Sequence, residues 1–179
     1  MATKDKDGSS WLNYLALTTV ILAVCATLST FKGGGYSTRS VMSQSQASDQ
    51  WAYFQAKGIK EYLYNMQKDK MELELSAIPK SSKELISAYE TKIALYEEKA
   101  KKYENERKDI EQQAKALEAA RDEAQLHSKA FGMAVIFLQI SILLSSIAGL
   151  LKKQSVWYLS LATGLAGILY FADGFLLFL

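Results

Sequence analysis

Three apolar runs bracket one long charged stretch, and this layout constrains the fold more than any other feature of the chain. The runs are Trp11 to Phe31, Phe131 to Leu151 and Val156 to Leu179. Each is long enough for a membrane-spanning helix, because the hydrocarbon core of a bilayer requires about 20 residues at roughly 1.5 Å of rise per residue. Only Gln139 and Asp173 are strongly polar within the second and third runs. The sequence therefore predicts an all-α protein with three transmembrane helices in the lipid bilayer.

The first run also has a competing interpretation, as a signal peptide. The polar tail before it, residues 1–10, contains Lys4 and Lys6, and small residues such as Ala26 lie near the end of the run. Its full spanning length favours a transmembrane helix. Cys25 is the only cysteine, so it cannot form an internal disulfide, and we expect it to be a buried apolar side chain.

The charged stretch, residues 32–130, holds 17 of the 21 Lys and Arg and 16 of the 19 Asp and Glu, with both signs interleaved. A mixed surface of this kind lacks the basic stripe through which nucleic acid is bound. It is typical of a solvated helix surface. Nucleic acid is therefore not an expected partner.

The only proline, Pro79, divides the charged stretch into two helical arms, because a proline disfavours helix at the residue before it. Gly33 to Gly35 are expected to form a flexible connector after the first span. Beyond the proline, Ser81 and Glu84 have the spacing of a capping box, which predicts that a new helix begins there. We expect a turn near residues 78–81 between the arms.

The second arm carries the strongest periodic signal. Alternating steps of three and four residues meet apolar or aromatic side chains at eleven of fourteen positions, which predicts a coiled-coil seam. These positions are Ile86, Tyr89, Ile93, Tyr96, Ala100, Tyr103, Arg107, Ile110, Ala114, Leu117, Arg121, Ala124, Ser128 and Phe131. No proline or glycine lies between Ser81 and Ala130, so we expect one helix from Ser82 through Leu151.

The first arm repeats the same alternating spacing less regularly. Its set is Ala52, Ala56, Ile59, Leu63, Met66, Lys70, Leu73 and Ala77. Together the arms predict a long antiparallel coiled-coil helical hairpin outside the membrane, with its base at the membrane surface. Arg107 and Arg121 fall on the seam, where polar residues can fix register or oligomeric state. A hairpin with one stripe on each arm buries little area, so we expect a homo-oligomer, or assembly with other membrane proteins.

Small residues spaced four apart predict close contacts between the spans, because they let helix backbones approach. Such lines are Thr19, Ala23 and Thr27 on the first span, Ser141, Ser145 and Gly149 on the second, and Thr163 with Gly167 and Ala162 with Ala166 on the third.

Asp173 is the sharpest chemical feature, because a carboxylate at the centre of a span costs about 2.5 to 3.5 kcal/mol. The third span folds back on the second, so Asp173 is expected near Lys32, His127 and Lys129. One interpretation is an interfacial acid held by one of these cations or by water. The other is an ion or proton site shared with Gln139 and a neighbouring subunit. His127, as the only histidine, is expected to be a surface residue rather than a metal ligand.

Basic residues near the spans decide the orientation. Four lie on one side, Lys4, Lys6, Lys152 and Lys153, and four on the other, Lys32, Arg39, Arg121 and Lys129. In this rule, basic residues in short loops count more than those at the edges of a long extramembrane segment. The amino terminus and the basic loop at 152–155 are therefore expected in the cytoplasm. The hairpin is then expected in the periplasm.

The stretch Ser48 to Glu61, SDQWAYFQAKGIKE, together with the three-span layout, resembles the bacterial membrane proteins grouped as domain of unknown function 4337. The likeness covers most of the chain and implies a bacterial inner-membrane protein with no established activity. Within the motif, Asp49, Trp51, Gln55 and Lys57 are candidates for a special role, and the first three are expected near one helix face. The alternative is that Asp49 and Trp51 cap and pack the hairpin base.

No pattern indicates enzyme chemistry: the sequence has no phosphate-binding glycine loop after a strand, no metal-spaced His or Cys pair, and no Ser and acid that His127 could complete. We expect no enzymatic activity and no cofactor. The expected function is that of a structural, scaffold or adaptor component. One alternative is a small oligomeric channel or transport accessory with Asp173 and Gln139 near a pathway; another is a sensor whose hairpin signals to the spans.

Overall fold

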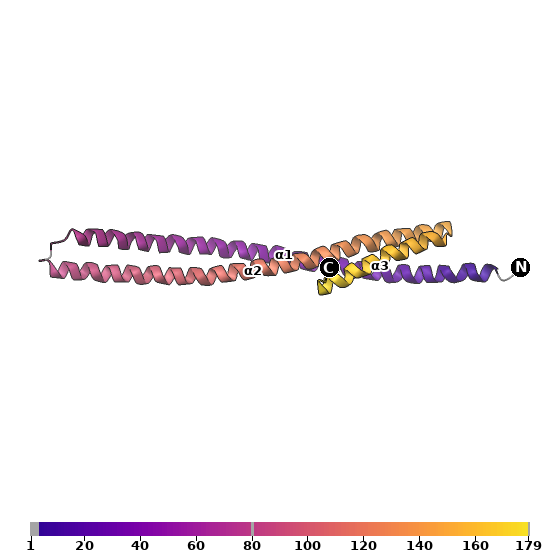
Figure 1. Ribbon diagram of the computed structural model, residues 1–179, viewed down its shortest axis with the longest axis horizontal. Helices are drawn as coiled ribbons and strands as arrows, with labels where there is room; N and C mark the ends of the chain where they lie inside the picture. The colour runs from indigo at the N-terminus through magenta and orange to yellow at the C-terminus, as the bar shows by residue number, and fades with distance from the viewer. Residues whose placement is uncertain (1–3, 80, 179) are drawn as a thin grey trace. The chain divides into compact units, whose positions relative to one another are not determined.

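The computed structural model describes the backbone of residues 4–79 and 81–178, and the side chains of the same residues from Trp11 onward. These residues form three α-helices and no strand: α1 is Lys4–Ser76, α2 is Lys83–Leu151 and α3 is Gln154–Leu176 (Figure 1). The predicted all-α class is confirmed. The side chains of the predicted polar tail, and Leu179 at the end of the predicted third span, lie outside the described residues.

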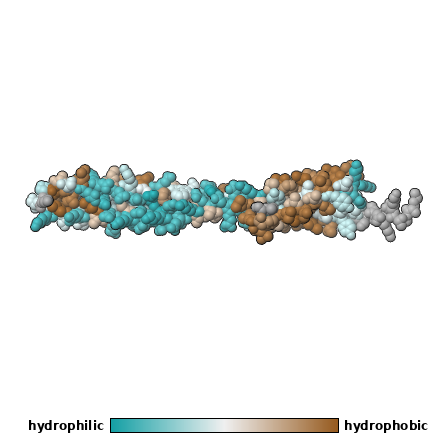
Figure 2. Space-filling view, in the orientation of Figure 1, coloured by the Kyte–Doolittle hydropathy of each residue, from teal (hydrophilic) through white to brown (hydrophobic). Residues whose placement is uncertain are grey.

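Contacts among the helices divide the chain into two units. The three-helix unit combines Met1–Met42 with Ala120–Leu179, and the two-helix unit is Ser43–Ala119. Each of the three helices contains a stretch long and apolar enough to cross a membrane, by length and composition. Figure 2 shows a hydrophobic surface over the helices of the three-helix unit and a hydrophilic one over most of the two-helix unit.

In the two-helix unit, α1 and α2 pack in antiparallel orientation (Figure 1). The Trp51 indole N–H donates to Glu118 over 2.9 Å, and at the other end the Tyr89 hydroxyl donates to Glu74 over 3.1 Å. Residues further along α1 therefore contact residues that come earlier along α2, as antiparallel packing requires. All fourteen positions predicted for the α2 seam are buried or half-buried.

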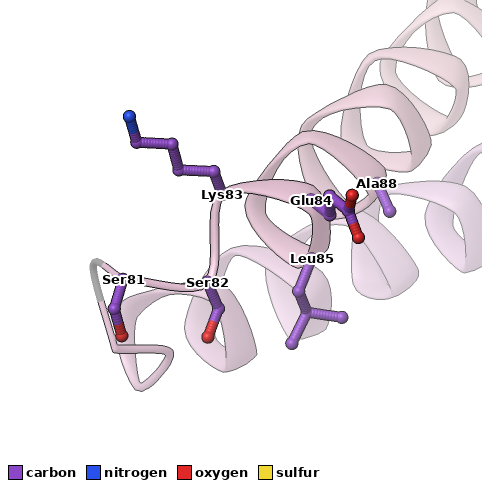
Figure 3. A pocket seen from close by; sticks show the side chains of 6 residues that line it. All are labelled: Ser81, Ser82, Lys83, Glu84, Leu85 and Ala88. Atoms are coloured by element: carbon purple, nitrogen blue, oxygen red, sulfur yellow. The ribbon is translucent and has the colours of Figure 1, made fainter.

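The connection between α1 and α2 is a tight turn around Pro79. Its carbonyl accepts the Ser82 N–H over 3.0 Å, and the Ser82 carbonyl accepts the Ile86 N–H over 3.1 Å. Ser82 is thus the N-cap of α2, one residue later than the predicted capping box at Ser81 (Figure 3). The prediction was wrong because the Pro79–Ser82 turn holds Ser81 outside the helix.

The stripe predicted as the seam of the first arm faces away from α2. Its large side chains are exposed, at 62% for Ile59, 46% for Leu63 and 73% for Leu73. The face that packs on α2 lies two residues earlier at each step, and two residues rotate a helix by about 200°. That inward face consists of Ala47, Gln50, Phe54, Lys57, Glu61, Tyr64, Lys68, Met71, Leu75 and Ile78. Apolar character alone favours the opposite face, because the inward face includes the charged residues Lys57, Glu61 and Lys68.

Gly33 to Gly35 are not a flexible connector, because α1 continues through them. Gly33 is buried, and its carbonyl accepts the Ser128 hydroxyl over 3.2 Å. A Cβ at Gly33 would lie 3.0 Å from the Phe131 Cβ, whereas one at Gly34 would meet open space. Gly33 therefore permits a close approach of α1 and α2, the use typical of small residues between apolar helices.

The core of the three-helix unit is small and tightly packed. Leu22 and Ala26 of α1 meet Ala134 and Leu138 of α2, and Cys25 is half-buried against them. The small residues predicted on the second and third spans are confirmed only in part. Ser141, Ser145 and Gly167 are buried, and a Cβ at Gly167 would lie 2.8 Å from Leu138 Cγ of α2. Ala162 is exposed, and a Cβ at Gly149 would lie 3.8 Å from Leu15 of α1. The line predicted on the first span was wrong in part, since Ala23 and Thr27 are exposed.

Candidate functional site

A cluster of four charged side chains lies between α1 and α2 in the two-helix unit. Lys57 Nζ is 2.5 Å from Glu106 Oε2, and Arg107 Nη1 donates to Glu61 Oε2 over 2.7 Å. The side chains of Lys57 and Glu61 are only 13% and 19% exposed. Each pair joins one residue of α1 to one of α2, so the two helices are tied by matched charges in their shared interior. We refer to Lys57, Glu61, Glu106 and Arg107 as the charge cluster.

Aromatic rings surround the two cations of the cluster. Lys57 Nζ lies 5.0 Å from the centroid of the Tyr53 ring and 5.2 Å from that of Tyr103. The Arg107 guanidinium lies 4.4 Å over the Phe54 ring. At these distances the faces of the rings attract cations. The rings therefore offset part of the hydration that the half-buried cations lose.

Gly58 makes room for the guanidinium. A Cβ at this position would lie 3.4 Å from Arg107 Nε and 3.6 Å from its Cζ. Glycine weakens a helix interior by roughly 0.5–1 kcal/mol relative to alanine. The packing of Arg107 gives this glycine of α1 a specific role.

The charge pairs shift the ionisation of their members. The hydrogen bond from Lys57, the largest cause, holds the pKa of Glu106 below its ordinary value against the opposing effect of burial. The same bond raises the pKa of Lys57 above its ordinary value. Both directions favour the charged forms, so the pair is ionised at neutral pH.

The motif candidates divide between the inward and outward sides of α1. Trp51 packs edge-on against Phe54 with ring centroids 5.4 Å apart, and Lys57 belongs to the charge cluster. Asp49 and Gln55 are exposed. The expectation that Asp49, Trp51 and Gln55 share a face was wrong, because residues two apart point in nearly opposite directions. Asp49 is also no cap, since α1 is continuous there.

In the three-helix unit, the end of α3 lies against α2. Because a carbonyl can only accept, His127 Nδ1 donates to the Gly174 carbonyl over 2.9 Å. The imidazole is stacked on Tyr36, with centroids 4.4 Å apart. Lys32 Nζ lies 6.0 Å from the ring of Phe175. The predicted return of the third helix therefore brings its last turn to His127 and Lys32.

Asp173 is buried and closes the end of its own helix. Its Oδ1 accepts the Phe178 N–H over 2.7 Å, and its carbonyl accepts the Leu177 N–H over 2.8 Å. Leu177 has φ 50, the left-handed conformation that commonly ends a helix. The carboxylate thus satisfies a backbone donor at the point where α3 stops.

Gln139 is exposed and does not join Asp173 in one site. Phe131, which packs on Gly174 beside Asp173, lies eight residues before Gln139 on α2, or about 12 Å along the axis at 1.5 Å per residue. Within one chain, the two polar residues of the second and third spans are therefore separated.

A hydroxyl cluster joins α2 to α3. The Ser160 hydroxyl donates to the Ser141 carbonyl over 2.9 Å and lies 2.6 Å from Ser145 Oγ, and the Ser141 hydroxyl donates to the Ser160 carbonyl over 2.6 Å. All three serines are fully buried. Ser141 and Ser145 follow from the spacing of small residues in the sequence, whereas Ser160, Glu61 and Glu106 stand out in no pattern used above. A search for opposite charges on the two arms, paired in antiparallel order, would have found the two acids.

Comparison with known protein families finds one described as a domain of unknown function (DUF4337), whose model matches residues 11–177. No curated protein matches the chain, and no solved structure matches it.

Proposed function

The chain belongs to the family of domain of unknown function 4337, and we propose that it is an integral membrane protein with a structural role. In this proposal the three-helix unit is anchored in the bacterial inner membrane. The two-helix unit is a coiled-coil hairpin on the periplasmic side, through which the protein assembles with itself or with other membrane proteins. The amino terminus lies in the cytoplasm.

The outer surface of the three-helix unit supports membrane anchoring. Large apolar side chains there are exposed to half or more of their area: Leu17, Val20, Val24, Ile136, Leu143 and Leu165. They come from all three helices, and a contiguous apolar surface of this kind marks contact with lipid or protein (Figure 2). Lipid would cover it around the whole unit.

The polar groups of this unit also suit an apolar surrounding. The hydroxyls of Thr19, Thr27 and Thr30 each donate to the carbonyl four residues earlier. The buried serines satisfy one another between α2 and α3. Because these hydroxyls are hydrogen-bonded inside the protein, they avoid the free-energy cost of an unpaired polar group in hydrocarbon.

The single observation that carries the structural role is the charge cluster. A seam built only of apolar side chains tolerates several registers, whereas a polar residue on a seam selects one. The Arg107–Glu61 and Lys57–Glu106 pairs require one antiparallel register of α1 and α2. We infer that specificity of assembly, at some expense of stability, is what this hairpin provides.

Membrane fractionation and cysteine labelling test the anchoring. We expect the chain to stay with the inner membrane after alkaline carbonate washing. In a Cys25→Ser background, Ser81→Cys in the turn should react with a membrane-impermeant maleimide in intact cells with a permeabilised outer membrane. Release by carbonate would overturn the anchoring, and labelling only after the inner membrane is opened would reverse the orientation.

A further inference from the structure

The outward side of α1 in the two-helix unit carries an apolar stripe that α2 does not cover. We call it the outer stripe: Ala52, Ala56, Ile59, Leu63, Met66, Leu73 and Ala77, with Lys70 as its one charged member. Its side chains recur in alternating steps of three and four. Figure 2 shows hydrophobic side chains on the otherwise hydrophilic surface of this unit, near the turn. The outer stripe is more apolar than the inward face of the same helix, which holds Lys57, Glu61 and Lys68.

The outward side of α2 is different. It is covered by ion pairs between residues four apart: Glu97 with Lys101, Glu104 with Lys108, and Glu111 with Lys115. Such pairs are suited to water. The exposed surfaces of the two helices therefore differ in polarity. That of α2 is charged, whereas that of α1 is apolar and suited to contact with a further helix.

The spacing of the outer stripe defines its occupant as a helix that follows α1 along its length. A repeat of 3.5 residues matches a supercoiled helical partner, and a compact ligand would not need it over some 25 residues. The stripe of a second copy has this repeat at the same height above the membrane and in the same direction. Membrane anchoring, on which this inference rests, holds the two stripes at high effective concentration.

The one charged residue of the stripe fits a parallel pair of copies. Lys70 follows Asp69 and is reached from Met66 by a step of four. In a parallel two-fold coiled coil, a seam residue at such a position packs beside its own counterpart and beside the residue that precedes that counterpart. Lys70 of one copy then lies against both Lys70 and Asp69 of the other, and the two Asp69 carboxylates offset the repulsion between the two amines. Lys70 is 64% exposed and 3.7 Å from Glu74 of its own helix, so its amine is free of the hairpin interior and can reach the second copy.

We propose that two copies of the chain pair in parallel through the outer stripe of α1, with α2 of each copy on the outside. The assembly is a four-helix bundle in which α1 meets α2 through the charge cluster and meets the second α1 through the outer stripe. The two contacts use opposite sides of one helix.

Cysteine cross-linking of the full chain in native membranes tests this arrangement. In the Cys25→Ser background, Ile59→Cys and Leu73→Cys should each form a disulfide-linked dimer on mild oxidation. Only a parallel pair in register brings both residues next to their own counterparts, because they lie 14 residues apart. Leu95→Cys is the control on α2, where Leu95 is also exposed, at 47% against 62% for Ile59 and 73% for Leu73. Cross-linking at only one of the two stripe positions, or equally at Leu95, would overturn the proposal.

A second pair of variants measures the contribution of the stripe to assembly. Leu63→Lys should weaken dimerisation at least tenfold in mass photometry, whereas Leu95→Lys should leave it unchanged. Both side chains are exposed within the hairpin, so helix content by circular dichroism should stay the same. A dimer that survives Leu63→Lys overturns the outer stripe as the interface while self-assembly stands. A wild-type chain that is monomeric overturns the self-assembly of the proposed function as well.

Discussion

Arg107 of α2 donates to Glu61 of α1 over 2.7 Å while its guanidinium lies 4.4 Å over the ring of Phe54. Arg107, which lies on a mostly apolar seam, thus makes both a hydrogen bond and a ring-packing contact with α1. Both contacts require that α1 and α2 keep one register. The register of the two helices is therefore determined by polar as well as apolar side chains between them.

Removal of the guanidinium should destabilise the hairpin. Arg107→Ala removes the partner of Glu61, whose side chain is only 19% exposed in the intact pair, and we expect a loss of about 1–3 kcal/mol in the free energy of unfolding. Chemical denaturation followed by circular dichroism measures it. Lys108→Ala removes an exposed pair with Glu104 and should have no measurable effect. An equal loss of stability in the two variants would contradict the role of Arg107 in holding α1 against α2.

The Lys57–Glu106 pair predicts a specific pH dependence. The folded-state pKa of Glu106 is lowered, so its contribution is present above the unfolded pKa and is lost as pH falls through the folded one. The raised pKa of Lys57 places its own loss at high pH, as pH rises through the folded value. The stability difference between wild type and Glu106→Gln should therefore be full at pH 7 and shrink in the acid range. A difference that is unchanged at pH 2 would contradict the pairing.

Two neighbouring glycines of α1 should respond in opposite ways to alanine. At Gly34 the new Cβ meets open space, so the higher helix propensity should stabilise the chain by about 0.5–1 kcal/mol. At Gly33 it would press on Phe131 Cβ at 3.0 Å, and we expect a lower melting temperature in detergent. Stabilisation by both variants would show that α1 and α2 do not approach closely there.

How far the sequence predicts this structure differs between the two long helices. The α2 seam follows from apolar periodicity, because eleven of its fourteen residues are apolar or aromatic. The α1 register does not follow from it, because Lys57 and Glu61 take inward positions that only partners on α2 explain. The three-glycine run predicts a linker at Gly33 for the same reason: its close approach to Phe131 is a tertiary contact that no local pattern records.

Ser160 should hold α2 and α3 together through hydrogen bonds that lipid cannot replace. Ser160→Ala removes the hydroxyl that lies 3.2 Å from Ser141 Oγ and 2.6 Å from Ser145 Oγ, and a loss of about 0.5–2 kcal/mol is expected in a detergent unfolding titration. Ser146→Ala is the control, because the exposed Ser146 hydroxyl donates only to the carbonyl of Ile142 in its own helix. A larger effect at Ser146 would contradict the role of the cluster.

Asp173→Asn separates a structural carboxylate from one that lines an ion pathway. Because Asp173 Oδ1 accepts a backbone N–H at the end of α3, we expect no ion flux in liposomes from either wild type or variant. The variant should melt at a slightly lower temperature, since a neutral amide oxygen is a weaker acceptor than a carboxylate. Wild-type flux that the substitution abolishes would favour the channel alternative.

The most direct test of the proposal that the protein is anchored in the membrane and assembles with itself is the mass of the full chain in nanodiscs. Mass photometry measures it, with the lipid and scaffold contributions subtracted. We expect a protein mass of two copies or a multiple of two. A mass of one copy across the accessible concentration range would contradict it.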